Sequence, residues 1–411
     1  MTVFSLIFRF FKYSNLSPAN FSKLSLMMLL QYFIWGTWYV TMGTYMATAL
    51  NATGVQIGAA YGALAIATMI SPFFVGLVAD RFFAAQRIMG ILHLGGSVVL
   101  YLATIVKDNT AFYWIILFYS LLYMPTIALS NSIAFRQMKD PGKQFPWIRV
   151  FGTLGWIIAG ILIGNLGVEK TSTPFYVGAA ASLALGLISF ILPNTPPTGK
   201  TNTASAAAGT DAMILLRDKS YLIFFIAAIL VCIPLSFYYG FANLFLNELG
   251  LENAAGKMIL GQVSEALFIL AIPFLFNNIG VKNMLLVGMI AWILRYVCFA
   301  FGTIQSEWML FLGIILHGIC YDFFFVTGYM YTEKKAGEKI KNAAQGLFTF
   351  ATYGVGMFIG TSFSGFTADY YLKDGVHQWQ LIWFVPALIA MAVLVYFILF
   401  FREKKEIQAI N

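Results

Sequence analysis

The chain has 411 residues, of which 60% are hydrophobic and only 10% charged, and its mean hydropathy is +0.79. A soluble domain carries about 25% charged residues, so this composition excludes a water-soluble globular protein. The apolar runs are about 20 residues long and do not alternate in polarity, which predicts an all-α membrane protein.

The first half of the chain contains an aromatic, basic segment and then six apolar runs. Residues 1–23 include Phe4, Phe8 and Arg9 and are expected to lie on the cytoplasmic face of the membrane. Each run that follows is long enough to cross the hydrocarbon as a helix. The predicted spans lie at about 25–50, 55–79, 88–106, 111–135, 148–167 and 174–193. They form a predicted bundle over residues 24–193.

A polar stretch rich in Pro, Gly, Thr and Ala, residues 194–219, separates these spans from six more. The second set of predicted spans lies at about 220–248, 256–277, 281–303, 307–332, 342–367 and 378–401. They form a second predicted bundle over residues 220–401, and residues 402–411 follow as a cytoplasmic tail.

A small-xxx-small motif occurs at matching positions of the two halves, as Gly160-Ile-Leu-Ile-Gly164 and Gly356-Met-Phe-Ile-Gly360. Either motif alone is explained by generic helix packing, but their matching placement indicates a six-plus-six duplication. The predicted fold is therefore twelve transmembrane helices in two pseudo-symmetric six-helix bundles.

The positions of the basic residues predict the orientation of the spans. Of the 25 Lys and Arg, nineteen lie on the side that holds both termini and the 194–219 linker, four lie on the other side, and Arg149 and Arg295 lie inside spans. Because cytoplasmic loops carry an excess of Lys and Arg, both termini and the linker are predicted to be cytoplasmic. The same bias accounts for the net charge of +8, so nucleic-acid binding is not needed to explain it.

The loop after the second span carries Gly76, Asp80 and Arg81 in a glycine-x-x-x-aspartate-arginine pattern, with Arg87 further on. Glycine permits close helix approach, and an aspartate can cap a helix end or pair with a basic side chain. The pattern resembles the loop between the second and third helices of the major facilitator superfamily, which implies a role in gating rather than in substrate contact.

Four strongly ionisable residues lie well inside the predicted spans: Arg149, Glu265, Arg295 and Asp322. A charge at this depth costs roughly 2.5–3.5 kcal/mol on insertion scales. Two structural ion pairs are one explanation, and for Arg295 packing and function are equally supported. For Glu265 and Asp322 we favour function, because intramembrane carboxylates commonly mark proton or substrate paths.

Polar and aromatic side chains accompany these charges at helical spacing. His317, near Asp322 in the sequence, is a candidate titrating group. The candidate substrate-binding residues are Arg149, Thr153, Trp156, Ser236, Tyr239, Gln262, Glu265, His317 and Tyr321. Together they offer donors, acceptors and flat aromatic faces, which suit a small neutral ligand with hydroxyl groups and a planar ring.

The sequence resembles the nucleoside:proton symporter family of the major facilitator superfamily over nearly its whole length. The matching strings include Gln31-Tyr-Phe-Ile-Trp35, Phe145-Pro146-Trp-Ile-Arg149-Val-Phe-Gly152-Thr153, Gln262-Val-Ser-Glu265 and Tyr321-Asp322-Phe-Phe. The resemblance implies that Arg149, Thr153, Gln262 and Glu265 contact a nucleoside. It also implies that Glu265 and Asp322 are the candidates for proton coupling.

Five positions depart from the pattern of that family. Ser236 and Tyr239 replace a glutamine and an asparagine, His317 and Tyr321 replace a tyrosine and a phenylalanine, and Trp156 replaces a phenylalanine. We expect the changed positions to face the base of the ligand.

The resemblance implies a monomeric importer that carries nucleosides with protons across the bacterial inner membrane by alternating access. Its expected partners are the nucleoside, protons and membrane lipid, with no cofactor and no metal. A transporter of a sugar or another small polar metabolite in the same fold is the alternative. An intramembrane enzyme is disfavoured, because the chain lacks HExxH and GxSxG motifs and clustered metal ligands.

Overall fold

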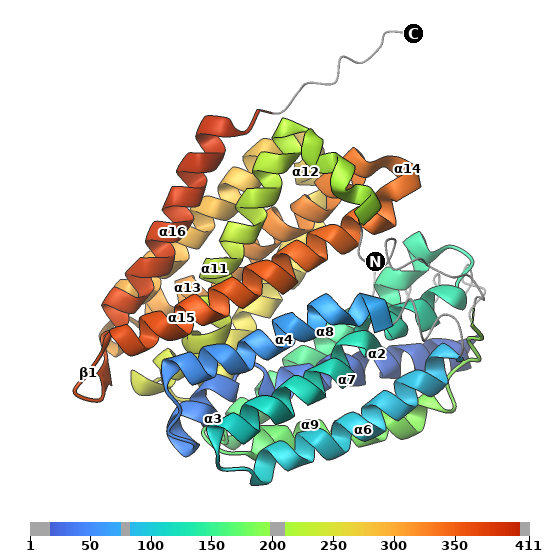
Figure 1. Cartoon of the computed structure of the whole chain (residues 1–411), viewed down its shortest axis with the longest axis horizontal. Coiled ribbons are helices and arrows are strands. Elements are labelled where there is room, and N and C mark those ends of the chain that lie inside the picture. The colour runs from blue at the N-terminus through green and yellow to red at the C-terminus, as the bar shows by residue number, and fades with distance from the viewer. Residues whose placement is uncertain (1–16, 75–82, 198–209, 403–411) are drawn as a thin grey trace, which may run out of the picture. The chain divides into compact units, whose positions relative to one another are not determined.

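The structure is a computed structural model of the chain and describes residues 17–74, 83–197 and 210–402. Figure 1 shows its helices and strands. The chain divides into two compact units, and each is described by itself. The first unit contains Met1–Ala204 and Tyr239–Ile259, and the second contains Ser205–Tyr238 and Leu260–Asn411. The predicted boundaries of the two six-helix bundles stay a prediction.

The first unit is built from apolar helices. Within the described residues these are α2 (Pro18–Trp38), α3 (Met42–Ala49), α4 (Gly54–Phe74), α6 (Ala85–Ile105), α7 (Asn109–Arg136), α8 (Pro141–Leu166) and α9 (Thr173–Ser189). Polar side chains cap three of them: Ser17 accepts a hydrogen bond from the backbone N–H of Asn20, Thr53 from that of Gln56, and Asp108 from that of Ala111. Each cap satisfies a backbone donor that the first helical turn leaves without a partner.

The second unit is also helical. Its described elements are η2 (Thr210–Arg217), α11 (Lys219–Glu248), α12 (Ala254–Phe301), η3 (Ile304–Ser306), α13 (Glu307–Tyr321), the π-helix η4 (Asp322–Val326), α14 (Thr327–Thr349), the π-helix η5 (Phe350–Gly356), α15 (Met357–Tyr370) and α16 (Trp379–Phe400). The end of α11 and the beginning of α12 belong to the first unit. These two helices therefore run from one unit into the other.

Glycine interrupts two of the long helices. Gly280 in α12 has φ 73° and Gly337 in α14 has φ 64°, a left-handed conformation that glycine adopts without a steric penalty. At each glycine the helical conformation stops and a second helical segment begins. Gly280 thus separates the predicted spans 256–277 and 281–303.

A short antiparallel hairpin, β1 (Leu372–Lys373) and β2 (Val376–His377), precedes α16. Its two turn residues, Asp374 and Gly375, have φ angles of 50° and 76°. Positive φ at both central residues is the requirement of a type I′ turn, for which Asp-Gly is a favoured pair.

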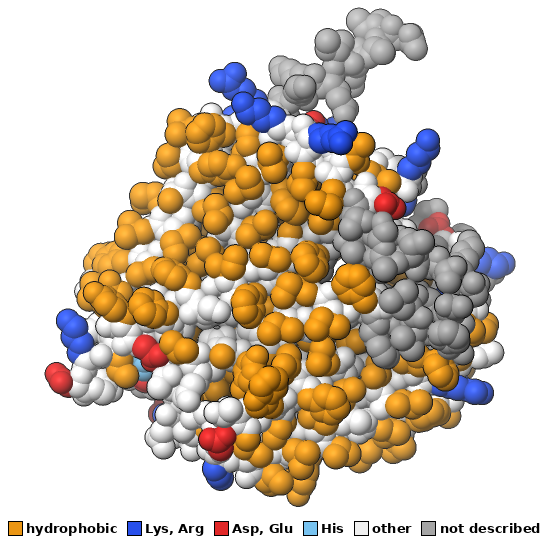
Figure 2. All heavy atoms as spheres, viewed as in Figure 1, with side chains coloured by type: hydrophobic (Ala, Val, Ile, Leu, Met, Phe, Trp, Pro, Cys, Tyr) orange, Lys and Arg blue, Asp and Glu red, His pale blue; other side chains and the backbone are white. Residues whose placement is uncertain are grey.

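The described helices have the composition of membrane spans. Ten helical segments are long and apolar enough to cross a membrane, and Thr173–Ser189 is a shorter apolar helix. Large apolar side chains such as Leu270 and Phe274 are 78% and 71% exposed, and Figure 2 shows hydrophobic side chains across the helices with charged ones near the margins. An apolar surface of this extent suits lipid rather than water. The all-α prediction is confirmed for the described residues, apart from the hairpin.

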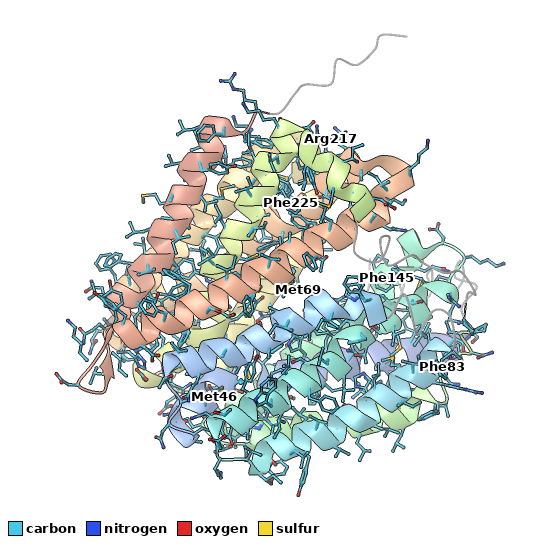
Figure 3. All side chains as sticks on the ribbon, in the orientation of Figure 1. Met46, Met69, Phe83, Phe145, Arg217 and Phe225 are labelled. Carbon is cyan, nitrogen blue, oxygen red and sulfur yellow. The ribbon has the colours of Figure 1, made fainter. Side chains whose placement is uncertain are left out.

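Close helix packing forms the core of each unit, where side chains fill the spaces between helices (Figure 3). In the first unit α2 packs along α8, and a Cβ atom added at Gly155 would lie 2.1 Å from the carbonyl oxygen of Leu29. The small-xxx-small motifs are packing surfaces as well. Gly160 faces Ile259 of α12, and in the second unit Gly360 faces α11.

Within the first unit, a buried carboxylate binds both the end of α11 and the beginning of α12. Glu169, in the turn between α8 and α9, is only 4% exposed. Its Oε2 accepts hydrogen bonds from the side-chain amides of Asn243 (2.7 Å) and Asn247 (2.9 Å). Its Oε1 accepts one from the backbone N–H of Ala255 (2.9 Å), in the first turn of α12. Thr44 of α3 completes the cluster by donating to Asn243 Oδ1 at 2.5 Å.

Candidate functional site

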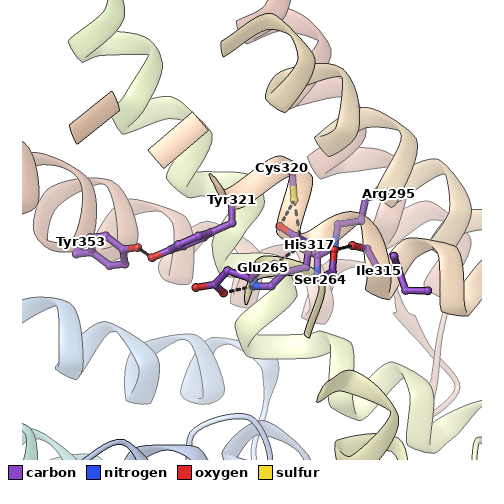
Figure 4. Close-up of polar contacts among 8 residues, drawn as sticks. All are labelled: Ser264, Glu265, Arg295, Ile315, His317, Cys320, Tyr321 and Tyr353. Atoms are coloured by element: carbon purple, nitrogen blue, oxygen red, sulfur yellow. Dashed lines mark hydrogen bonds and ion pairs between the residues drawn. The ribbon is translucent and has the colours of Figure 1, made fainter. Parts of the chain in front are cut away.

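The intramembrane acid Glu265 lies in the second unit, on α12, and its side chain is 32% exposed. Gln262, one turn earlier, is half-buried as well. Because the two residues are three positions apart on one helix, they share a face. His317 of α13 lies beside this face, with its Nε2 4.0 Å from Oε2 of Glu265 (Figure 4).

Tight packing between α12 and α13 fixes the position of His317 against Glu265. Ser264 donates a hydrogen bond from Oγ to the carbonyl oxygen of Ile315 at 2.6 Å. A Cβ atom added at Gly318 would lie 2.4 Å from the carbonyl carbon of Ser264, and one added at Gly261 would lie 3.1 Å from Cβ of His317. The two helix backbones therefore approach as closely as glycine allows at this level.

Arg295 of α12, one of the two intramembrane cations, contacts His317 through the other ring nitrogen. It is fully buried, and its Nη1 lies 2.9 Å from His317 Nδ1 and 3.5 Å from Cys320 Sγ. Its guanidinium carbon lies 3.5 Å from the ring centroid of Tyr238, which is a cation–π contact. The sequence left packing and function equally supported for Arg295, and the structure places it in direct contact with a predicted site residue.

Two tyrosines extend the cluster in the other direction. Tyr321, the last residue of α13, and Tyr353, in the π-helix η5, are hydrogen-bonded through their hydroxyl groups. In Figure 4 the carboxylate of Glu265 and the ring of Tyr321 lie on the same side of His317, and Arg295 lies on the opposite side. Sequence reasoning missed Tyr353, because a tyrosine within an apolar run is more often a packing residue and no spacing rule connects it to Tyr321.

Asp322 is the first residue of the π-helix η4 and is fully buried. Within the described part of the chain, neither of its carboxylate oxygens has a hydrogen-bond partner. A π-helical turn inside an α-helix often marks a functional position. A charged carboxylate without a partner is costly in an apolar interior, so a bound proton lowers the cost of keeping Asp322 in this place.

Arg149, the intramembrane cation of α8, lies in the first unit. Its guanidinium carbon is 4.0 Å from the ring centroid of Tyr32 on α2, and both side chains are half-buried. A Cβ atom added at Gly152 would lie 2.5 Å from Nη1 of Arg149 and 2.7 Å from the ring of Tyr32. Glycine at position 152 therefore makes room for this cation–π pair. Thr153, one turn after Arg149, is also half-buried.

Aromatic side chains gather close to these residues in the first unit. The ring of Trp156 is 5.6 Å from that of Trp35 and 6.2 Å from that of Tyr39, and Tyr39 is 5.3 Å from Tyr239 of α11. The structure therefore connects Trp156 and Tyr239 through Tyr39. Tyr39 was not predicted, because a tyrosine within an apolar run gives no signal of its own.

A buried polar network in the first unit includes Gln31, the residue before Tyr32, and its centre, His93, was also missed. His93 of α6 pairs through Nε2 with Gln31 Oε1 at 2.9 Å and through Nδ1 with Ser182 Oγ at 3.1 Å. Gln31 donates in turn to Thr126 Oγ1 at 2.8 Å. These bonds connect α2, α6, α7 and α9 and hold the helix that carries Tyr32.

The remaining predicted residues lie apart from these clusters or outside the described residues. Ser236 is fully buried, and its hydroxyl donates to the carbonyl oxygen of Cys232 at 2.8 Å where α11 meets Gly360. Arg87 is exposed in the first turn of α6. The gating residues Gly76, Asp80 and Arg81 lie outside the described residues.

Comparison with known proteins shows which family this arrangement belongs to. The model of a family described as nucleoside H+ symporter matches residues 20–406. The chain belongs to the nucleoside H+ symporter family. YegT of Escherichia coli (strain K12) is 41% identical over 95% of this chain and 96% of its own length. Xanthosine permease of the same organism is 36% identical over 95% of this chain and 97% of its own length.

The fold of this symporter matches a solved member of the family. The crystal structure of nucleoside transporter NupG has a TM-score of 0.86 and 33% identity, and the match covers 93% of this chain and 99% of that one. The match includes residues of both units, so both units have the fold of this family. The symporter is therefore a membrane transporter, as the resemblance of its sequence predicted.

Proposed function

We propose that this symporter imports nucleosides together with protons across the bacterial inner membrane by alternating access. Its family and the names of its relatives, xanthosine permease and nucleoside transporter NupG, support a nucleoside as the cargo. The observation that carries the proposal is the pair of carboxyl groups in the second unit. Glu265 is half-buried among polar groups, whereas Asp322 is fully buried with neither oxygen hydrogen-bonded within the described residues.

The two acids are proposed to have different roles in symport, one in binding the proton and the other in binding the cargo. Asp322 suits the binding of a proton, because protonation removes an uncompensated charge from an apolar interior. Glu265 suits contact with the cargo, because it shares a face with Gln262 and its side chain is 32% exposed. A bound proton on either acid changes the charge that the transporter carries between its two conformations.

The chemistry of the half-buried groups fits a nucleoside. A carboxylate accepts hydrogen bonds from ribose hydroxyls, an amide both accepts and donates, and aromatic rings offer flat faces to a base. The proposed cargo contacts are Arg149, Thr153, Trp156, Tyr239, Gln262, Glu265 and Tyr321. Ser236 and His317 are left out as direct contacts, because both are fully buried, Ser236 bonded within its own helix and His317 against Arg295.

We also propose the finer topology. Adding Pro18–Trp38 and Thr173–Ser189 to the ten apolar segments gives twelve spans in two six-helix bundles. The excess of Lys and Arg places both termini in the cytoplasm. Gly76, Asp80, Arg81 and Arg87 are the proposed gating residues, and the transporter is proposed to act as a monomer.

Transport by the purified protein in liposomes tests the proposed function. With the interior alkaline and the exterior at pH 6, labelled uridine should accumulate, and collapsing the proton gradient with an ionophore should abolish the accumulation. Competition by unlabelled nucleosides, free ribose, hexoses and nucleobases then identifies the cargo. Competition by ribose or hexoses but not by nucleosides would establish the sugar alternative. Uridine uptake that is the same with and without the proton gradient would contradict symport.

A further inference from the structure

The contact between Arg295 and His317 determines where the imidazole ring carries its proton. An arginine guanidinium has only donors, and a neutral imidazole has one donor and one acceptor nitrogen. Because Nη1 of Arg295 lies 2.9 Å from Nδ1 of His317, Nδ1 must accept and the ring proton must be on Nε2. Nε2 is the nitrogen that lies 4.0 Å from Oε2 of Glu265.

We propose that Arg295 is a positioning residue that fixes His317 as a neutral ring and directs its Nε2–H toward the carboxylate of Glu265. In this arrangement His317 orients Glu265 and does not carry the transported proton. The inference rests on the proposed function only for the role of Glu265 in binding the cargo.

The surroundings of Arg295 hold its guanidinium in place. The guanidinium lies over the ring of Tyr238 at 3.5 Å, and His317 stacks on the same ring with centroids 5.1 Å apart. Within the described residues no carboxylate forms an ion pair with Arg295, and its Nε and Nη2 have no hydrogen-bond partner. Its positive charge lies in direct contact with the ring of His317.

A second proton on His317 conflicts with this geometry. An imidazolium has donors on both nitrogens, so its Nδ1–H would face an N–H of Arg295 at 2.9 Å. The titratable and charged groups that face the ring are Arg295 and Glu265 from α12, Tyr238 from α11, and Cys320 and Tyr321 from α13. Of these groups, the carboxylate of Glu265 favours the imidazolium, and it lies farther from the ring than Arg295 does.

Nitrogen NMR of the wild-type protein tests the tautomer without any transport measurement. The chain has three histidines, so a sample labelled with ¹⁵N at histidine gives few signals, and the pair missing from His317→Gln belongs to His317. A neutral ring gives two well-separated nitrogen signals, and an imidazolium gives two similar ones. We expect a neutral Nε2–H ring that does not titrate between pH 5 and 8. An Nδ1–H ring, or a titration within this range, would overturn the proposal.

Removal of the guanidinium tests the function of the contact. In Arg295→Met, Nδ1 loses its donor and the neighbouring positive charge is removed, so the ring takes a second proton more readily than in wild type and can pair with Glu265. The KM for uridine in counterflow, with equal pH on both sides of the membrane, should then rise by a larger factor between pH 7.5 and 5.5 than it does in wild type. The additional rise should be absent from the double variant Arg295→Met/His317→Gln, whose residue 317 cannot titrate.

The outcomes separate this proposal from the proposed function. If wild-type protein transports no nucleoside, the proposed function fails, and the NMR measurement still decides the tautomer. If wild type transports uridine but Arg295→Met has the pH dependence of wild type, the positioning role is wrong. If Arg295→Met does not fold, the wild-type NMR titration remains the deciding measurement.

Discussion

The carboxylate of Glu169 accepts a hydrogen bond of 2.7 Å from the side-chain amide of Asn243, although the two residues are 74 positions apart in the sequence. Through this bond, and those from Asn247 and the backbone of Ala255, one acid in a turn holds the adjoining ends of α11 and α12. The first unit therefore depends on a polar contact as well as on apolar packing.

Glu169→Ala is expected to lower the thermal stability of the protein in detergent. The substitution leaves the buried amide of Asn243, the half-buried amide of Asn247 and one backbone N–H without this acceptor, and a buried group costs about 1–3 kcal/mol when water does not replace the lost partner. Glu169→Gln is the matched control, because it keeps one acceptor oxygen and should lose less. A Glu169→Ala protein that unfolds at the wild-type temperature would contradict the role given to this carboxylate.

Asp322→Asn is expected to abolish proton-driven accumulation of uridine and to retain counterflow. Neither oxygen of Asp322 has a hydrogen-bond partner in the described part of the chain, so the amide replaces the carboxyl without breaking a bond. Glu265→Gln, at the proposed cargo contact, should instead weaken uridine binding, which a thermal-shift titration measures. A variant at position 322 that still concentrates uridine against its gradient would show that Asp322 is not a coupling group.

Gly318→Ala is expected to impair folding and transport, because the added methyl group would lie 2.4 Å from the backbone of Ser264. Overpacking of this kind costs about 1–3 kcal/mol and would separate His317 from Glu265. Gly346→Ala in α14 is the matched control, since a Cβ atom there meets nothing within 4 Å. Fluorescence size-exclusion chromatography after heating compares the two variants, and equal stability would contradict the close approach of α12 and α13.

The Asp218–Lys335 pair predicts a small pH-dependent contribution to stability. Burial alone would raise the pKa of Asp218, but hydrogen bonds from the backbone of Tyr221 and from Lys335, at 3.1 Å, lower it below the ordinary value. A lowered folded-state pKa gives stability that is present above the unfolded-state pKa and is lost as pH falls through the folded-state value. Because both side chains are about 30% exposed, the pair contributes about 0.2–1 kcal/mol.

Asp218→Asn separates the ion pair from the helix cap, because asparagine still accepts from the backbone N–H of Tyr221. Its melting temperature should lie slightly below that of wild type at pH 7, and the difference should shrink as the pH approaches 4 and below. Lys335→Met should have the same effect. A difference that grows on acidification would have the wrong sign for this pair.

The membrane class, most of the helical spans and the unusual acids could be predicted from the residues alone. Lipid requires a long apolar helix, so each span is visible as a run of hydrophobic residues, and Glu265 and Asp322 are conspicuous because a charge is costly there. The helix break at Gly280 also falls where the sequence separates two runs.

The partners of those acids could not be predicted in the same way. No local sequence pattern distinguishes Tyr353, Tyr39 and His93 from packing residues. Glu169 has the sequence context of an acidic residue in an exposed loop. Their roles depend on which helices lie side by side, and hydrogen bonds between residues 32 to 89 positions apart establish this.

Local chemistry thus dictates which segments of this chain must be helical and embedded in lipid, because each backbone polar group has to be satisfied within its own segment. The local sequence does not determine which side chains contact one another between helices. The pairing of Arg295 with His317, and of Tyr321 with Tyr353, arises from the packing of helices against one another, and no spacing rule along the chain contains it.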